Sequence, residues 1–74
     1  MKIQQRVLLL GIYTKEQDET VNEVIVKLEE TGLFTLKEGK RLLKNLKASG
    51  YLHKSELTLS GLNKAREIEK EFKI

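Results

Sequence analysis

Residues 35–50 read TLKEGKRLLKNLKASG, and this stretch decides the fold. In a helix, where successive side chains lie about 100° apart, it has one apolar side and one basic side. The apolar side holds Leu36, Gly39, Leu42, Leu43, Leu46 and Gly50. The opposite side holds Lys37, Arg41, Lys44 and Ala48, flanked by Lys40, Asn45 and Lys47. We therefore predict a helix that packs by its leucines and exposes a basic ridge made of Lys37, Arg41 and Lys44.

Both ends of this predicted helix carry end signals. Thr35 and Glu38 have the S/T-x-x-E spacing of a capping box, in which the hydroxyl accepts from the Glu38 N–H and the carboxylate accepts from the Thr35 N–H. Gly50 suits the left-handed backbone at which many helices stop. The stretch therefore predicts one bounded helix between residues 35 and 50.

Two more helices are predicted before this one. Residues 2–14 form a helix that is apolar on nearly every side: one face holds Ile3, Val7, Leu10 and Thr14, whereas Leu8, Leu9 and Ile12 point elsewhere. Residues 20–31 form the second, with a Thr20–Glu23 cap, a possible stop at Gly32 and the stripe Val21, Val24, Ile25 and Leu28. The run at 24–26 also suits a strand, but residues 27–30 continue in good helix formers, which favours a helix.

The period changes after Gly50. Two short pieces, 51–53 and 56–59, are compatible with strands around Lys54 and Ser55, which predicts a small hairpin with Leu52, Leu57 and Leu59 facing the core. A last helix, capped by Thr58 or Ser60, is expected to run to about Phe72. Its predicted stripe is Leu62, Ala65, Ile68 and Phe72. The expected fold is one domain, residues 1–74, mainly α-helical with a small β-hairpin.

Composition narrows the class of protein. The chain has 74 residues and no Cys, so neither disulfides nor thiolate metal sites can stabilise it. Its two Tyr, two Phe and no Trp predict a mostly aliphatic core, small enough to make dimerisation a reasonable expectation. No apolar run approaches the ~18 residues of a membrane span, and the start lacks a signal-peptide pattern, which predicts a cytoplasmic location.

Positive charge is concentrated in the middle of the chain. The formal net charge is +3, but residues 35–54 carry six basic residues against Glu38 alone. Residues 13–34 instead carry six acidic residues against two lysines. A localised basic patch on an otherwise mixed surface is typical of a protein with a polyanionic partner.

Two stretches resemble winged helix-turn-helix domains. Residues 27–52, KLEETGLFTLKEGKRLLKNLKASGYL, look like the family's second helix, turn and recognition helix. The L-x-x-L-x-x-x-G-Y/L run that closes that helix is here Leu43, Leu46, Gly50, Tyr51 and Leu52. Residues 57–65, LTLSGLNKA, resemble the L-T-x-x-G stretch with which many MarR- and PadR-type prokaryotic regulators leave the wing. The resemblance covers almost the whole chain and implies a three-helix core, a short wing and a C-terminal helix.

The resemblance also implies a role in double-stranded DNA binding and transcription regulation, with the 35–50 helix in the major groove. Phosphates would then be neutralised by Lys37, Lys40, Arg41, Lys44 and Lys47. Arg41 and Asn45 are the residues able to make bidentate contacts, with guanine and adenine respectively. Lys54 and His53 would lie near the flanking backbone, although this wing is short and contains a single lysine, whereas family wings are often longer and basic at the tip.

Other chemistry is poorly supported by the sequence. One His, no Cys and no glycine-rich phosphate loop leave no catalytic triad, metal cage or nucleotide site, so we expect no enzyme, cofactor, metal or small-molecule ligand. The acidic residues at 16–23 lack the pattern of a calcium loop. The alternative is a winged-helix protein–protein interaction module within a larger assembly, in which the lysines serve solubility. The discriminating feature is whether the basic ridge is neutralised by Glu23, Glu29 or Glu30.

The sequence finally predicts a homodimer built on the N- and C-terminal helices. The first helix has apolar residues, Leu8, Leu9 and Ile12, that lie off its Ile3–Val7–Leu10 face. The last helix offers Leu62, Ile68 and Phe72 at spacings that suit a partner helix. A two-fold dimer would place two recognition helices about 34 Å apart, as successive major grooves require.

Overall fold

The computed structural model describes residues 2–72, which form four helices and one hairpin. The elements are α1 (Ile3–Thr14), α2 (Val21–Glu30), α3 (Leu36–Ala48), β1 (Leu52–His53), β2 (Glu56–Leu57) and α4 (Leu59–Phe72). The predicted class, mainly α with a small antiparallel hairpin, is confirmed. None of the helices within residues 2–72 has the length and apolar character to cross a bilayer.

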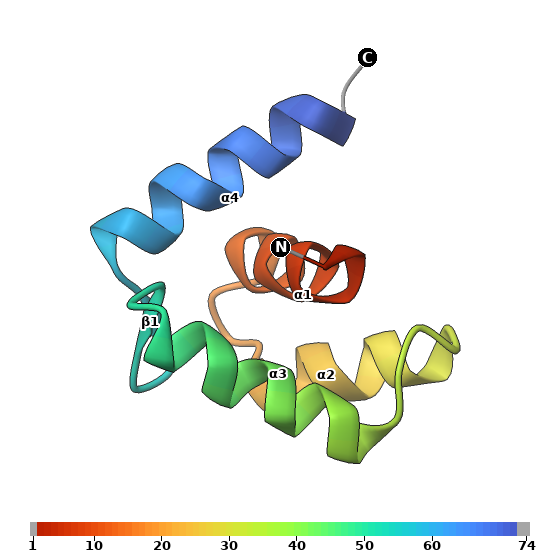
Figure 1. Ribbon diagram of the computed structural model, residues 1–74. Helices are drawn as coiled ribbons and strands as arrows, with labels where there is room; N and C mark the ends of the chain where they lie inside the picture. The colour runs from red at the N-terminus through yellow and green to blue at the C-terminus, as the bar shows by residue number, and fades with distance from the viewer. Residues whose placement is uncertain (1, 73–74) are drawn as a thin grey trace.

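Helix α1 is the centre of the molecule. It lies between α4 on one side and α2 and α3 on the other, and it contacts all three (Figure 1). The buried side chains around it are aliphatic except for one phenylalanine, as predicted: Leu8, Leu9, Ile12, Val21, Val24, Ile25, Phe34, Leu42, Leu46, Leu52, Ala65 and Ile68. The helix is apolar nearly all round because three helices surround it.

An all-round apolar helix can be central to its own core or partly buried against another chain, and α1 is central. Leu8, Leu9 and Ile12, which supported the prediction of a dimer, are buried in the protein's own core, so that argument was wrong. Ile3, on the face shared with Val7 and Leu10, is 54% exposed. Both sets recur with helical spacing, so periodicity alone does not choose between them; the positions of the neighbouring helices do. The surplus of apolar surface that supported a dimer is therefore not located at Leu8, Leu9 and Ile12.

The caps of α2 and α3 form largely as predicted. The Glu23 N–H donates to the Thr20 hydroxyl at 3.2 Å, although the reciprocal Glu23 carboxylate contact is not found among the described residues. At α3 the full capping box is present: Thr35 N–H donates to Glu38 Oε1 at 3.0 Å and Glu38 N–H donates to Thr35 Oγ1 at 3.1 Å. Gly50 has φ 84°, the left-handed conformation expected after the helix.

Close packing of α3 on α2 depends on Gly39. A Cβ at this position would lie 2.7 Å from Ile25 Cγ2 and 2.9 Å from Phe34 Cε1, so only glycine allows the two helices their present approach. Leu42 and Leu46 continue the buried side, whereas Leu43 is half-buried and Leu36, in the first turn, is exposed. The predicted apolar side is thus buried at its centre and open at its edges.

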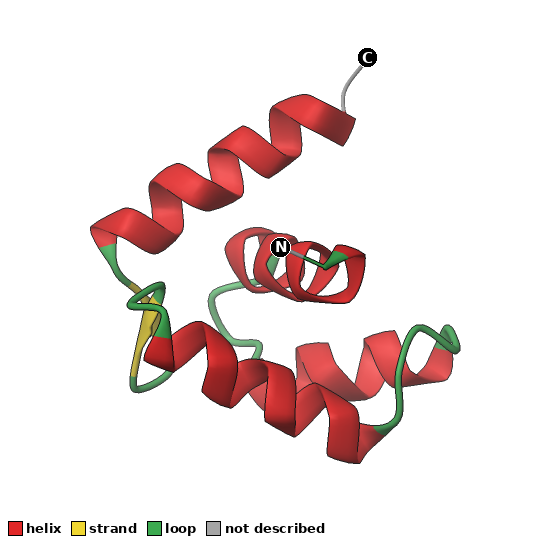
Figure 2. Cartoon of the chain, viewed as in Figure 1, coloured by secondary structure: helices red, strands yellow, loops and turns green. Residues whose placement is uncertain are grey.

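The hairpin lies between the end of α3 and the start of α4 (Figure 2). Leu52 pairs with Leu57 and His53 with Glu56, around a loop of Lys54 and Ser55. Thr58 joins it to α4: its hydroxyl donates to the Gly50 carbonyl at 2.6 Å and accepts from the Gly61 N–H at 3.0 Å. Thr58, rather than Ser60, is therefore the cap of α4.

Two predicted core positions in this region are wrong. Leu59 is 75% exposed, because it begins α4 immediately after the Thr58 cap and α4 turns its Ala65–Ile68 side toward α1. Phe72 is 49% exposed because it lies one turn beyond Ile68, the last buried residue of α4. Leu52 is buried as expected, and Leu57 and Leu62 are half-buried.

Candidate nucleic-acid interface

The basic ridge lies on the outer side of α3. Its cap and its leucines fix this orientation, because burying Gly39, Leu42 and Leu46 directs the opposite side to solvent. All the predicted interface residues are exposed: Lys37, Lys40, Arg41, Lys44, Asn45, Lys47 and Lys54. Four of them, Lys37, Lys40, Arg41 and Lys44, line one surface hollow of about 310 Å³. The structure therefore brings these four cations together on one surface.

No acidic residue among residues 2–72 forms an ion pair with the basic ridge. The ion pairs found among residues 2–72 join Lys27 to Glu19, Arg6 to Glu71 at 2.9 Å and Lys64 to Glu67 at 3.5 Å, and none includes a cation of α3. Glu23, Glu29 and Glu30 therefore do not act as the counter-charges that a solubility role would suggest. Crowded cations without protein partners attract anions, most strongly at low salt.

Glu38 is the acidic residue on α3. Hydrogen bonding to the Thr35 backbone, then to its side chain, holds the pKa of the Glu38 carboxyl below its ordinary value of 4.5, and the charge of Arg41 lowers it further. The carboxylate is therefore charged at neutral pH. It lies at the edge of the basic side rather than within the ridge, three residues before Arg41 and seven before Asn45.

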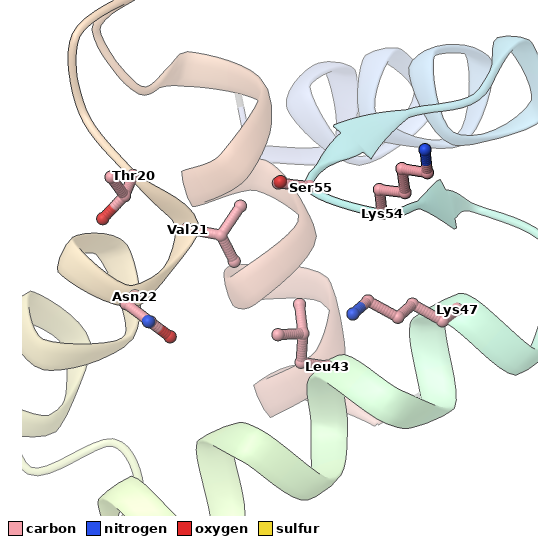
Figure 3. A pocket seen from close by; sticks show the side chains of 7 residues that line it. All are labelled: Thr20, Val21, Asn22, Leu43, Lys47, Lys54 and Ser55. Atoms are coloured by element: carbon pink, nitrogen blue, oxygen red, sulfur yellow. The ribbon is translucent and has the colours of Figure 1, made fainter.

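On the hairpin side of α3 there is a second hollow, of about 320 Å³, which Figure 3 shows from close by. It is bounded by α3, the start of α2 and the hairpin loop, with Leu43, Val21 and Ser55 in its wall. The Lys47 ammonium points into this hollow, whereas the Lys54 ammonium points outward from the loop (Figure 3). The positive end of the α2 dipole adds to the field of Lys47 there. The short hairpin therefore places Lys54 beside α3.

On the opposite side, α1 crosses the edge of α3. Arg41 and Asn45 line a groove of about 220 Å³ together with Glu38 and with Lys2 and Gln5 from the start of α1. Lys2 is the N-cap residue just before α1, and Gln5 lies in its first turn; neither was among the predicted site residues. No local signal marks them, because only the crossing of α1 over α3 brings them to the interface.

Among the described residues no group of three or more His, Cys, Asp and Glu gathers at metal-binding distance, and His53 is an exposed strand residue opposite Glu56. Comparison of the chain with protein-family models, curated proteins and solved structures finds no match.

Proposed function

We propose that the protein is a winged helix-turn-helix domain that binds double-stranded DNA through α3 and serves as a small, sequence-specific transcriptional regulator in the cytoplasm. The observation that carries this proposal is the basic ridge of Lys37, Arg41 and Lys44, which is exposed and has no ion-pair partner among the described residues. An interaction module with lysines for solubility gives no reason to gather cations on one helix and leave them without counter-charges.

The dimensions of α3 support this function. Its 13 residues span about 20 Å at 1.5 Å per residue. One side of the helix is buried and the opposite side is exposed to solvent. A major groove about 12 Å wide admits an α-helix, and the bases present their distinguishing donors and acceptors there. The turn between α2 and α3, with the hairpin directly after α3, follows the order of elements in a winged helix-turn-helix domain.

Different residue types receive different roles in this proposal. Lys37, Lys40, Lys44 and Lys47 neutralise phosphates, which supplies affinity without much sequence information. Arg41 and Asn45 can each make two parallel hydrogen bonds to one base. Lys54, on the outer side of the hairpin loop, reaches the neighbouring backbone.

We also propose a homodimer through the terminal helices, with Phe72 kept from the sequence prediction and Ile3 in place of Leu8, Leu9 and Ile12. Ile3 of α1 and Phe72 of α4 are both large, apolar and about half exposed. Each is close in sequence to one member of an ion pair between α1 and α4, since Arg6, one turn after Ile3, pairs with Glu71, the neighbour of Phe72. Covering both with a second copy would remove the main apolar exposure at this end of the molecule.

A salt titration on random duplex DNA tests the proposed function. With about four to six side chains meeting phosphates, the logarithm of the binding constant should fall with log salt at a slope of roughly −4 to −5. Lys37→Glu and Lys44→Glu should each weaken binding to all sequences alike, whereas Lys70→Glu on α4 should change it little. The proposal is refuted if both α3 variants bind random duplex as tightly as the parent.

A further inference from the structure

The two flanks of α3 differ in chemistry. The hairpin side holds Lys47 and Lys54 together with the polar side chains of Thr20, Asn22 and Ser55. The α1 side holds Glu38, Arg41 and Asn45, at i, i+3 and i+7, facing Lys2 and Gln5 across the groove. Carboxylate, guanidinium and amide groups suit cytosine, guanine and adenine respectively. The α1 flank is therefore the one that brings all three groups together, and the one that includes a carboxylate.

Glu38 is held in place by hydrogen bonds to Thr35. Its Oε1 accepts from the Thr35 N–H at 3.0 Å, and its own N–H donates to the Thr35 hydroxyl at 3.1 Å, so the side chain has already lost much of its rotamer freedom. Thr35 bonds the carboxylate through its backbone and its side chain, and the exposed carboxylate has further acceptor sites beside those that Thr35 uses. A fixed, charged acceptor thus forms part of the groove wall.

A fixed carboxylate on a DNA-facing surface is unfavourable unless a donor meets it. A phosphate repels the carboxylate because both are negatively charged. Guanine presents only acceptors in the major groove, so no hydrogen bond forms between it and the carboxylate. The amino group of cytosine is the base donor that suits a carboxylate in the major groove. Adenine offers an amino group too, but beside the acceptor N7, which a carboxylate disfavours and an amide does not.

We propose that Glu38 is a specificity-determining residue that selects a cytosine in the DNA site, from a base-reading groove formed by α1 and the edge of α3. This rests on the proposed function and extends it to one base. In this proposal the capping box has a second effect, because it holds the Glu38 carboxylate where it can accept from the cytosine amino group.

The test is a binding-site selection with the parent and Glu38→Gln. Glutamine keeps the acceptor for the Thr35 N–H, so the cap and the fold should survive, which thermal melting checks. It also carries a donor, which suits the amino and N7 groups of adenine. We expect the parent to prefer cytosine at one position by about 5- to 150-fold, the ratio that corresponds to a 1–3 kcal/mol contact. In the variant, the preference at that position should move to adenine.

Glu23→Gln is the matched control. It removes the same charge at the equivalent third position of α2, and Glu23 does not line the α1-side groove. This control should leave every base preference as in the parent, even if general affinity rises. A Glu38→Gln protein that melts like the parent and selects the parent's site overturns the inference. If the proposed function itself is wrong, the selection gives a different result: the parent protein binds no duplex at any salt concentration.

Discussion

Lys54 offers a test in which stability and binding are expected to change in opposite directions. It occupies the hairpin loop at φ 58°, in the left-handed region, although it is not glycine. A non-glycine residue in this conformation destabilises the folded state by about 1–2 kcal/mol, which glycine would avoid. Glycine also has more conformational freedom in the unfolded chain, which destabilises the folded state by about 0.5–1 kcal/mol. Lys54→Gly should therefore raise the free energy of unfolding by about 0.5–1 kcal/mol.

The same substitution should weaken DNA binding. Loss of one phosphate contact makes the slope of log K against log salt shallower by about 0.9, which at about 0.1 M salt corresponds to roughly eightfold weaker binding. Urea denaturation measures the first effect, and fluorescence anisotropy with a labelled duplex at several salt concentrations measures the second.

A charge-matched control separates contact from net charge. Lys70→Ala removes one positive charge from the last turn of α4, which lies across α1 from α3 (Figure 1). Its salt slope should equal that of the parent. If Lys54→Gly and Lys70→Ala have the same slope and affinity, the hairpin loop does not contact DNA, and the reasoning about Lys54 fails.

Two further predictions concern the start of α4 and the oligomeric state. A Cβ at Gly61 would lie 2.0 Å from the Tyr51 carbonyl oxygen, so Gly61→Ala should lower the free energy of unfolding by about 3 kcal/mol. The control Ser60→Ala, at the neighbouring position, should change it little. Equal urea midpoints for the two variants would contradict this account of the packing. Sedimentation at micromolar concentration should show a dimer for the parent and a monomer for Ile3→Glu with Phe72→Glu. A parent that sediments as an 8.5 kDa species at every concentration removes the dimer.

Local signals in the sequence were enough to place the helices. The Thr35–Glu38 pair and Gly50 act through hydrogen bonds and backbone conformation within a few residues, so they can be read without knowing the rest of the fold. The inward face of α1 could not be read in this way. Ile3 and Leu8 are both apolar, and the choice between them depends on where α4 and α3 pack.

The residues of the candidate site also differ in whether local sequence patterns could predict them. Arg41 and Asn45 lie on the exposed side that helical periodicity predicts, because the leucines of α3 determine it. Lys2 and Gln5 reach the same groove from more than 30 residues away in the chain, through the crossing of two helices. Their place at the interface depends on tertiary packing and leaves no trace in the local pattern.

The link made by Thr58 decides where this protein could be redesigned. Two-residue strands have little stability of their own, so the hairpin keeps its place through the hydroxyl that joins Gly50 to Gly61. Residues inserted between Lys54 and Ser55 would lengthen the loop at its open end and leave that link intact. Residues inserted between Leu57 and Gly61 would separate the hairpin from α4. Loop grafts that extend the reach of the hairpin therefore belong at its tip, with residues 57–61 kept unchanged.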